Sequence, residues 1–308
     1  MPEPAEAIRS RAVAEPTTAQ PAPAEPGAVE EVRLPATGGV TLAVRVANRT
    51  GPHAPVLLVH GLASNARTWD GVADRLAAHG HPVAAVDQRG HGRSDKPDGG
   101  YDFATICADL VAVLDGLGWS AGVRRPVVAG QSWGGNVVLE LAVRHPASVA
   151  AIGCVDGGTL ELARRWPTWP ACRAALTPPR LSGLTRDELA RLVRAWHPGW
   201  SDAGVEATLA NMEVRADGTI TPWLALDHHL AILRHLWEHH PPQRWPLVGM
   251  PVLLIPSAMA DADGVAAAQA ALAGHLRVSP FPGADHDVHV QYPTEVADLL
   301  HDLALDAT

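Results

Sequence analysis

The sequence predicts a doubly wound α/β fold, with a mostly parallel, eight-stranded sheet and a helical cap inserted after the sixth strand. Three features of the pattern support this prediction. Short, continuous apolar runs recur along the chain, and such runs are typical of strands buried on both faces of a parallel sheet. Amphipathic stretches separate them, as connecting helices do. One long segment, residues 157–245, then interrupts the alternation.

The first half of the chain divides into a tail and the start of the core domain, which we place at residues 28–156. Residues 1–27 are rich in Pro, Ala and Glu and lack apolar periodicity, so we predict a flexible tail. Alternating stretches at 29–34 and 40–46 flank the turn Thr37-Gly38-Gly39, which predicts an antiparallel pair. Buried strands are then predicted at 56–60, 83–87, 127–130 and 150–156, with helices at 66–79, 103–117 and 133–145.

The predicted cap, residues 157–245, contains no clear strand and consists of helical patches separated by Pro, Gly and Trp. We expect these patches to pack over the sheet. They lie at 186–196, 202–212 and 226–239. The core domain resumes at 246–308, with strands predicted at 252–256 and 276–281 and helices near 264–274 and 293–303.

Composition and charge exclude several classes of protein. The net charge of −9 leaves no broad basic surface for nucleic acid. The three cysteines form no CxxC or Cys/His spacing, which indicates neither a disulfide framework nor a zinc site. We expect no metal and no organic cofactor. No apolar run reaches the roughly 18 residues of a membrane span, and the N-terminus lacks the apolar stretch of a secretory signal. We therefore expect a cytoplasmic protein without nucleic-acid or membrane partners, and the oligomeric state stays open.

The strongest functional signal is Gly130-Gln131-Ser132-Trp133-Gly134, a G-x-S-x-G motif that follows a buried strand and opens a predicted helix. This context is typical of a nucleophile elbow, in which a sharp turn holds the serine in a strained backbone conformation. The Ser132 hydroxyl is expected to project above the sheet, where the helix N-terminus favours developing negative charge.

A second signal is His60-Gly61-Leu62, directly after the strand at 56–60. A backbone N–H of this loop would act with the N–H of Trp133 as an oxyanion donor, and we expect that of Leu62 to do so. We favour a structural role for the His60 side chain, and we also include His60 among the candidate pocket residues.

These motifs resemble those of the α/β-hydrolase fold superfamily, and the resemblance covers nearly everything from residue 29 to the end. The segment from Asp87 to Ser94 matches the family's D-x-R-G-x-G-x-S loop after the fourth strand. The resemblance implies a structural role for this loop, in which the glycines permit its turns while Asp87 and Arg89 fix it internally.

The resemblance also implies a triad in the chain order serine, acid, histidine. Residues 282–286 resemble the family's P-G-x-x-H segment, which makes His286 the candidate general base. His289, three residues further on, is its competitor.

The acid of this triad has three candidates. The family usually places it in the loop after the seventh strand, where Asp261 has the favoured spacing and Asp263 is the alternative. Asp156, at the end of the sixth strand, is the third candidate, because some relatives carry the acid there. We prefer Asp261, which would orient His286 and stabilise its imidazolium form.

Tryptophan is concentrated in the predicted cap. The chain has 10 Trp against 2 Tyr and 2 Phe, and most of the Trp residues lie between 157 and 245. One interpretation is that these rings supply buried area to a short, Pro-broken subdomain. The other is that some of them line an apolar pocket facing Ser132. The candidate lining residues in the cap are Trp166, Trp169, Trp196 and Trp223.

Together these features predict a capped serine hydrolase that cleaves a small, partly apolar ester or lactone through an acyl-enzyme. The resemblance disfavours haloalkane dehalogenase and epoxide hydrolase activity, since those relatives form an ester on an aspartate and position 132 is serine. Hydrolysis of carbon–carbon bonds, thioester cleavage and perhydrolysis remain alternatives. So does a proline-type aminopeptidase, with Glu206 and Glu213 as candidates for binding the substrate amine. A non-catalytic small-molecule binder of the same fold is the alternative outside enzymes.

Overall fold

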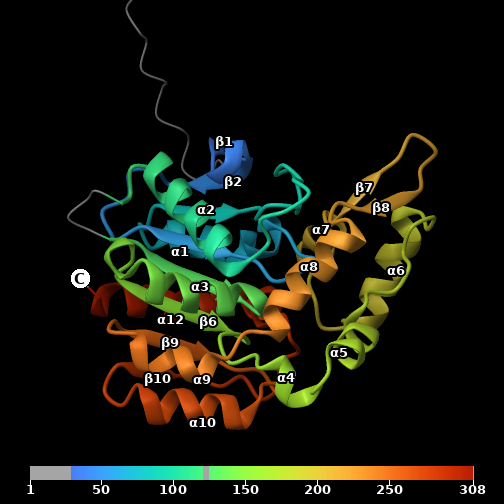
Figure 1. Ribbon diagram of the computed structural model, residues 1–308. Coiled ribbons are helices and arrows are strands. Elements are labelled where there is room, and N and C mark those ends of the chain that lie inside the picture. Colours follow the sequence, from blue (N-terminus) through green and yellow to red (C-terminus); the bar gives the residue numbers. More distant parts are fainter. Residues whose placement is uncertain (1–28, 121–124, 308) are drawn as a thin grey trace, which may run out of the picture.

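An eight-stranded sheet forms the centre of the protein in a computed structural model that describes residues 29–120 and 125–307 (Figure 1). The predicted tail, residues 1–27, lies outside the described residues. The strands are β1 (Glu30–Pro35), β2 (Thr41–Ala47), β3 (Val56–Val59), β4 (Val83–Val86), β5 (Val127–Gln131), β6 (Ala151–Val155), β9 (Val252–Ile255) and β10 (Leu276–Val278). Their order is β1-β2-β4-β3-β5-β6-β9-β10, and β2 pairs antiparallel with both neighbours while the other pairs are parallel. This arrangement confirms the predicted fold class.

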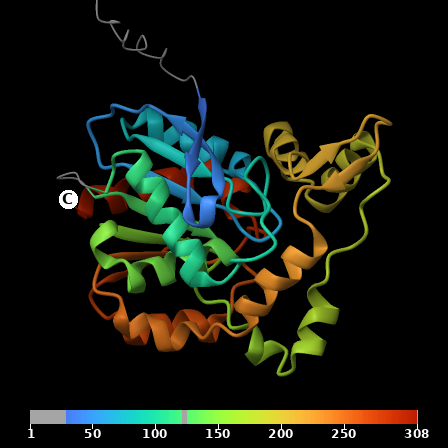
Figure 2. The ribbon, with the colours of Figure 1, turned by 45° about the horizontal axis from the view of Figure 1, so that its top comes forward.

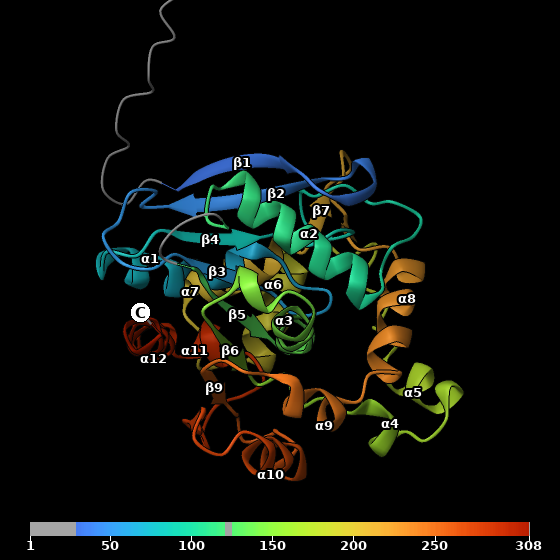
Figure 3. The same cartoon turned by 60° about the vertical axis from the view of Figure 1, so that its left-hand side comes forward.

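Helices cover both faces of the sheet (Figure 3). One face is covered by α1 (Asp70–Ala78) and α12 (Pro293–Asp306), and the other by α2 (Phe103–Gly116) and α3 (Trp133–Arg144). Two further helices of this part of the chain are α10 (Ala262–Ala271) and α11 (Val288–Gln291). In the described residues, no helix is both long and apolar enough to cross a bilayer.

The continuous apolar runs fill two cores at once. Successive side chains of a strand point to opposite faces, so alternate residues of β3 enter different clusters. Val56 and Leu58 pack with α1 and α12, whereas Leu57 and Val59 pack with α2 and α3. Burial on both faces explains why these strands carry no polar alternation.

Between β6 and β9 the chain leaves the sheet and forms a separate group of elements beside it (Figure 2). Its helices are α4 (Leu162–Arg165), α5 (Trp169–Leu176), α6 (Arg186–Trp196), α7 (Asp202–Leu209), α8 (Leu226–Trp237) and α9 (Pro241–Arg244). These elements occupy the segment predicted as a cap, and α6 has the predicted bounds.

One hairpin in this segment was not predicted. The strands β7 (Met212–Val214) and β8 (Ile220–Pro222) pair antiparallel, so the expectation of a segment without strands is wrong here. The connecting turn is closed by the Thr219 N–H and hydroxyl, which both donate to Asp217 Oδ1 at 2.9 and 2.6 Å. Strands of three residues are too short to show the alternation on which sequence prediction depends.

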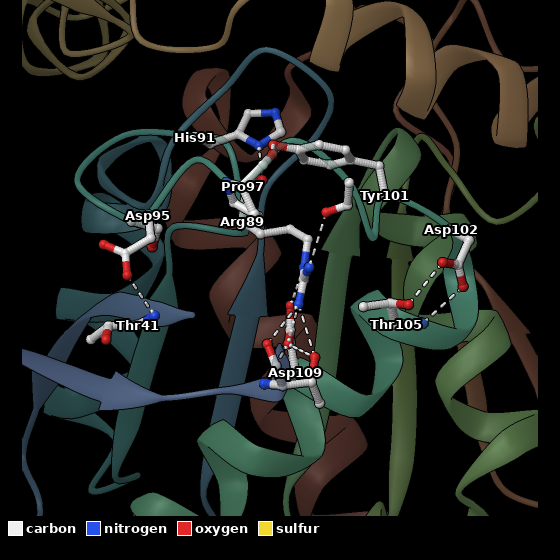
Figure 4. Close-up of polar contacts among 12 residues, drawn as sticks. Thr41, Arg89, His91, Asp95, Pro97, Tyr101, Asp102, Thr105 and Asp109 are labelled. Atoms are coloured by element: carbon white, nitrogen blue, oxygen red, sulfur yellow. Dashed lines mark hydrogen bonds and ion pairs between the residues drawn. The ribbon is translucent and has the colours of Figure 1, made fainter. Parts of the chain in front are cut away.

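A buried ion pair joins three segments at one end of the sheet (Figure 4). Arg89, in the loop after β4, donates from Nε to Asp109 Oδ2 at 2.6 Å and from Nη2 to Oδ1 at 2.8 Å. The backbone N–H of Thr37, in the β1–β2 turn, donates to the same carboxylate at 3.0 Å. Within this loop, the Asp87 carboxylate accepts the Arg93 N–H at 2.8 Å, and Arg89 Nη1 donates to the carbonyl oxygen of Gly99 at 3.3 Å. Arg89 therefore holds its own loop and also ties it to α2.

Removal of one partner of this pair is expected to be costly, because it leaves a charge buried without a counterion. We expect Asp109→Ala to lower the free energy of unfolding by about 3–5 kcal/mol in urea denaturation. Asp115→Ala, an exposed position of the same helix, is the matched control and should change it by no more than about 0.5 kcal/mol. Equal losses in the two variants would contradict a special role for the buried pair.

Candidate active site

Ser132 lies in the turn between β5 and α3 with a backbone conformation that non-glycine residues rarely adopt. Its φ is +54° and its ψ is −122°, a strained combination of the kind found at functional sites. The turn is so tight that a Cβ on Gly130 would lie 2.1 Å from the carbonyl oxygen of Gly134. A Cβ on Gly134 would lie 2.5 Å from the carbonyl oxygen of Val59, so both glycines of the motif are required by packing.

Two further side chains form a hydrogen-bonded row with the Ser132 hydroxyl. His286 Nε2 lies 2.8 Å from Ser132 Oγ, and His286 Nδ1 lies 2.5 Å from Asp156 Oδ2. Asp156 follows β6, which pairs directly with β5, so its carboxylate and the serine emerge at the same edge of the sheet. The other oxygen of Asp156 accepts the Ser257 N–H at 2.9 Å, which holds the carboxylate in place.

The preferred acid of the sequence prediction is wrong as the partner of His286. Asp261 is the N-cap of α10, where its side chain accepts the Asp263 N–H at 3.2 Å. Its other oxygen lies 3.8 Å from Arg164, which also binds Asp263. Asp261 is thus engaged by the N-terminus of α10, and Asp263 is engaged by an arginine of the cap. The signal for Asp156 was its position at the end of a buried strand beside the elbow, and strand order is a tertiary property.

Opposing effects act on the pKa of His286. Partial burial of the imidazole lowers it, whereas the hydrogen bond to Asp156 and the negative charges of Asp287, Asp156 and Asp285 raise it. The raising effects win, so the pKa of His286 lies above its ordinary value of 6.5. The negative surroundings therefore stabilise the imidazolium that forms when a histidine takes a proton from serine.

His289, the competing histidine, lies elsewhere in the core. It is fully buried, its ring packs 4.3 Å from that of Trp69, and both of its ring nitrogens lack a hydrogen-bond partner among the described residues. Burial, assisted by the charges of His286 and His60, lowers its pKa to about 3. It is therefore an uncharged packing residue near neutral pH.

The loop after β3 is held on both sides of Leu62. His60 Nδ1 lies 2.8 Å from the carbonyl oxygen of Gly61, and the Ala63 N–H donates to His91 Nε2 at 3.2 Å. Within the described part of the chain, the N–H groups of Leu62 and Trp133 meet no hydrogen-bond acceptor. The amides of Leu62 and Trp133 thus remain free in the described structure, and their role as oxyanion donors stays a prediction.

His60 itself does not line a cavity beside the serine. Its ring is completely buried, and its Nε2 accepts the Gln88 N–H at 3.0 Å. The prediction of His60 as a pocket residue is therefore wrong, and its contacts fit the structural role that we favoured. Both ring nitrogens are occupied in holding loops together.

Two cavities adjoin Ser132, with volumes of about 670 and 700 Å³. Four residues line both cavities: Leu62, Ser132, His229 and His286. Ser132 and His286 therefore lie where the two cavities meet. Most of the remaining walls come from the segment between β6 and β9.

The tryptophans of this segment divide between the cavities and the packing of the cap. Trp196 and Trp223 line the first cavity and Trp166 lines the second. Trp169 lines neither; its ring packs 6.2 Å from that of Trp237. Trp200 lines the first cavity and was not singled out, since one Trp among many carries no distinguishing signal in the sequence.

The acidic residues considered for amine binding lie away from both cavities. Glu206 is paired with Arg186, and Glu213 is exposed on β7. The acidic residue that lines the first cavity is instead Asp287, the residue after His286. Among the described residues, no group of three His, Cys, Asp or Glu side chains is arranged to hold a metal ion.

Comparison with known proteins gives consistent matches. The model of the alpha/beta hydrolase family matches residues 56–299. Epoxide hydrolase A of Mycobacterium tuberculosis is 38% identical over 139 residues, which are 44% of this chain and 41% of that protein. Non-heme chloroperoxidase of Streptomyces lividans is 39% identical over 97 residues, or 31% of this chain and 34% of that protein. The chain thus matches about two fifths or less of the length of these relatives.

Solved structures extend the likeness over most of the chain. E-2-(acetamidomethylene)succinate hydrolase superposes with a TM-score of 0.73 at 23% identity, covering 91% of this chain and 100% of that one. The thioesterase domain from the curacin biosynthetic pathway has a TM-score of 0.70 at 19% identity, covering 89% and 99%. At such identities the likeness shows the fold alone.

The buried state of His289 predicts a loss of stability in acid. The unfolded chain binds a proton on this residue near pH 6.5, whereas the folded protein does so only near pH 3. The free energy of unfolding should therefore fall as the pH drops through this window, by about 1.4 kcal/mol per pH unit from this residue. Urea denaturation between pH 7 and 4.5 should show a shallower decline for His289→Leu than for the exposed-site control His275→Leu. Parallel declines would contradict the prediction.

Proposed function

The chain belongs to the alpha/beta hydrolase family, and on that premise we propose that it is a serine hydrolase of small, partly apolar carboxylic esters or lactones. The observation that carries the proposal is the row from Asp156 through His286 to Ser132 at the junction of two largely apolar cavities. A small-molecule substrate and a cytoplasmic location are parts of the same proposal.

In the first half of the reaction, Ser132 Oγ attacks the carbonyl carbon of the substrate while His286 Nε2 accepts the hydroxyl proton. The amides of Leu62 and Trp133 donate hydrogen bonds to the oxyanion of the tetrahedral intermediate. Asp156 keeps the Nδ1 proton of His286 in place and stabilises the imidazolium. His286 then protonates the leaving alcohol, and an ester remains on Ser132.

In the second half, water attacks this ester and His286 accepts its proton as general base. A second tetrahedral intermediate uses the same amides, and the carboxylic acid leaves as Ser132 regains its proton. The two cavities suit this scheme because an acyl group and a leaving group can extend in different directions from the serine.

The names of some relatives suggest other chemistry, which position 132 argues against. One relative is named epoxide hydrolase A, and the resemblance implies an aspartate nucleophile for that activity. A serine hydroxyl cannot take the place of a carboxylate nucleophile in that reaction, so we do not transfer epoxide hydrolysis to this chain. The aminopeptidase alternative also loses support, because Glu206 and Glu213 lie outside the cavities.

The proposal predicts covalent labelling by a fluorophosphonate probe. Wild type should be labelled and Ser132→Ala should not, since the probe bonds to an activated serine hydroxyl. A well-folded wild type that resists the probe would overturn the proposal and favour a non-catalytic binder. Hydrolysis of short p-nitrophenyl esters, compared with proline anilides and thioesters, then separates esterase action from the alternatives.

The assignment of the acid is tested by paired amide variants. We expect Asp156→Asn to lower kcat for p-nitrophenyl acetate on the order of 10³- to 10⁴-fold, because the amide cannot hold the imidazole in its working tautomer. Asp261→Asn is the matched control and should stay within about threefold of wild type, because its carboxylate serves a helix terminus. The reverse order of effects would restore Asp261 as the acid.

The raised pKa of His286 predicts where activity is lost in acid. The base works only when neutral, so the rate of probe labelling should fall as the pH drops through a value above 6.5. In Asp156→Asn the residual rate should decline at a lower pH, because the carboxylate that favours the protonated imidazole is gone. An acidic limb below pH 6 in wild type would contradict the electrostatic argument.

A further inference from the structure

Asp285 immediately precedes His286 in the chain, and its side chain binds two residues of the cap. Its Oδ2 accepts hydrogen bonds from His197 Nδ1 and from Trp200 Nε1, both at 2.9 Å. These donors lie in the connection between α6 and α7, and their rings are stacked with centroids 3.9 Å apart. A preorganised pair of donors from the cap thus converges on one carboxylate oxygen of the loop that carries the general base.

The side chain and the backbone of Asp285 also form hydrogen bonds with residues that follow it in the chain. Asp285 Oδ1 accepts the Asp287 N–H at 2.9 Å, and the Asp285 N–H donates to Gln291 Oε1 at 2.9 Å. On the core side, Gln131 Nε2 donates to the carbonyl oxygen of His286 at 3.0 Å. His286 is therefore held on the core side by Gln131 and on the cap side through Asp285.

We propose that Asp285 is a positioning residue. By binding the α6–α7 connection of the cap, it keeps His286 within hydrogen-bond distance of Ser132. The proposal rests on the proposed serine hydrolase function. With the cap docked, the carboxylate is saturated by its donors and the loop keeps the 2.8 Å contact between His286 and Ser132. When the donors withdraw, the loop loses two of its tethers and the imidazole moves out of line.

The coupling reaches the substrate as well. His197, Trp200 and Asp287 all line the first cavity, so a molecule that fills this cavity touches the residues that hold the loop. A substrate that seats the α6–α7 connection would therefore improve the alignment of the base. A displacement of about 1 Å in such an alignment can lower a rate on the order of 100-fold.

The charged groups that face His286 make the role of Asp285 separable from simple packing. They are Asp156 from the end of β6 and Asp285 and Asp287 from its own loop, with His197 of the cap facing Asp287. The negative charge of Asp285 contributes to the raised pKa of His286. Loss of that charge should shift the pH profile, and loss of the tether should lower the rate.

The first test removes the tether from the cap side. Trp200→Phe deletes the indole N–H and keeps a ring to stack on His197, and we expect kcat for p-nitrophenyl acetate to fall on the order of 10-fold or more with KM changed less than threefold. The matched control is Trp237→Phe, which also deletes one indole N–H bond within the cap, to the carbonyl oxygen of Trp166 at 2.7 Å. It should retain wild-type kcat.

The second test separates tether from charge at Asp285. Asp285→Ala removes both, so kcat should fall at least as far as in Trp200→Phe and the acidic limb of the pH profile should move to lower pH. Asp285→Asn keeps one acceptor oxygen for the cap donors, so it should recover most of kcat while retaining the shifted pH profile. Full activity in Asp285→Ala, or losses confined to KM, would overturn the coupling.

A measurement without substrate keeps this result distinct from the proposed function. The amides of Asp287, Val290 and Gln291 form hydrogen bonds within the loop and between the loop and α11. Their hydrogen exchange should accelerate in Trp200→Phe relative to Trp237→Phe. Acceleration in a protein that resists fluorophosphonate would support the tether and reject the hydrolase. Unchanged exchange together with unchanged labelling rates would reject the coupling and leave the hydrolase standing.

Discussion

The site depends on the turn at Ser132, where a parallel strand passes into a helix with almost no connecting chain. The positive φ of Ser132 is strained, and it persists because Gly130 and Gly134 let the backbone segments come into close contact. The turn places the hydroxyl at the edge of the sheet and leaves the N–H of Trp133 without an acceptor in the described structure. The other reactive groups are arranged around this one point.

Electrostatics around His286 follow from the topology of the sheet. β6 lies next to β5, so Asp156 emerges beside the serine, while Asp285 and Asp287 flank the histidine in the loop after β10. Burial lowers the pKa of His286, but the hydrogen bond to Asp156 and the negative charges of the three carboxylates outweigh burial and raise it. Fully buried His289, three residues away, has its pKa lowered to about 3. Two histidines three residues apart, one in the loop and one in α11, therefore differ in charge preference because of their surroundings and not their chemistry.

The segment between β6 and β9 packs within itself and also lines the cavities beside Ser132. Trp169 packs within it, whereas Trp166, Trp196 and Trp200 face the cavities beside Ser132. The enrichment of Trp there is thus one compositional signal with two structural causes. The contact of Trp200 with Asp285 adds a third, since it links the cap to the loop that carries His286.

Features that depend on local pattern could be predicted from the amino-acid sequence. Apolar runs identified the buried strands, the G-x-S-x-G motif after a strand located Ser132, and its neighbours in the chain included the free amide of Trp133. The carboxylate partner of His286 was decided by tertiary structure: Asp261 has suitable spacing along the chain but caps a helix, and Asp156 meets His286 because strands distant in sequence lie adjacent in the sheet. The lining of the cavities was decided in the same way, because which face of a cap helix turns toward the serine depends on packing between segments and leaves no periodic mark in a chain this rich in Trp.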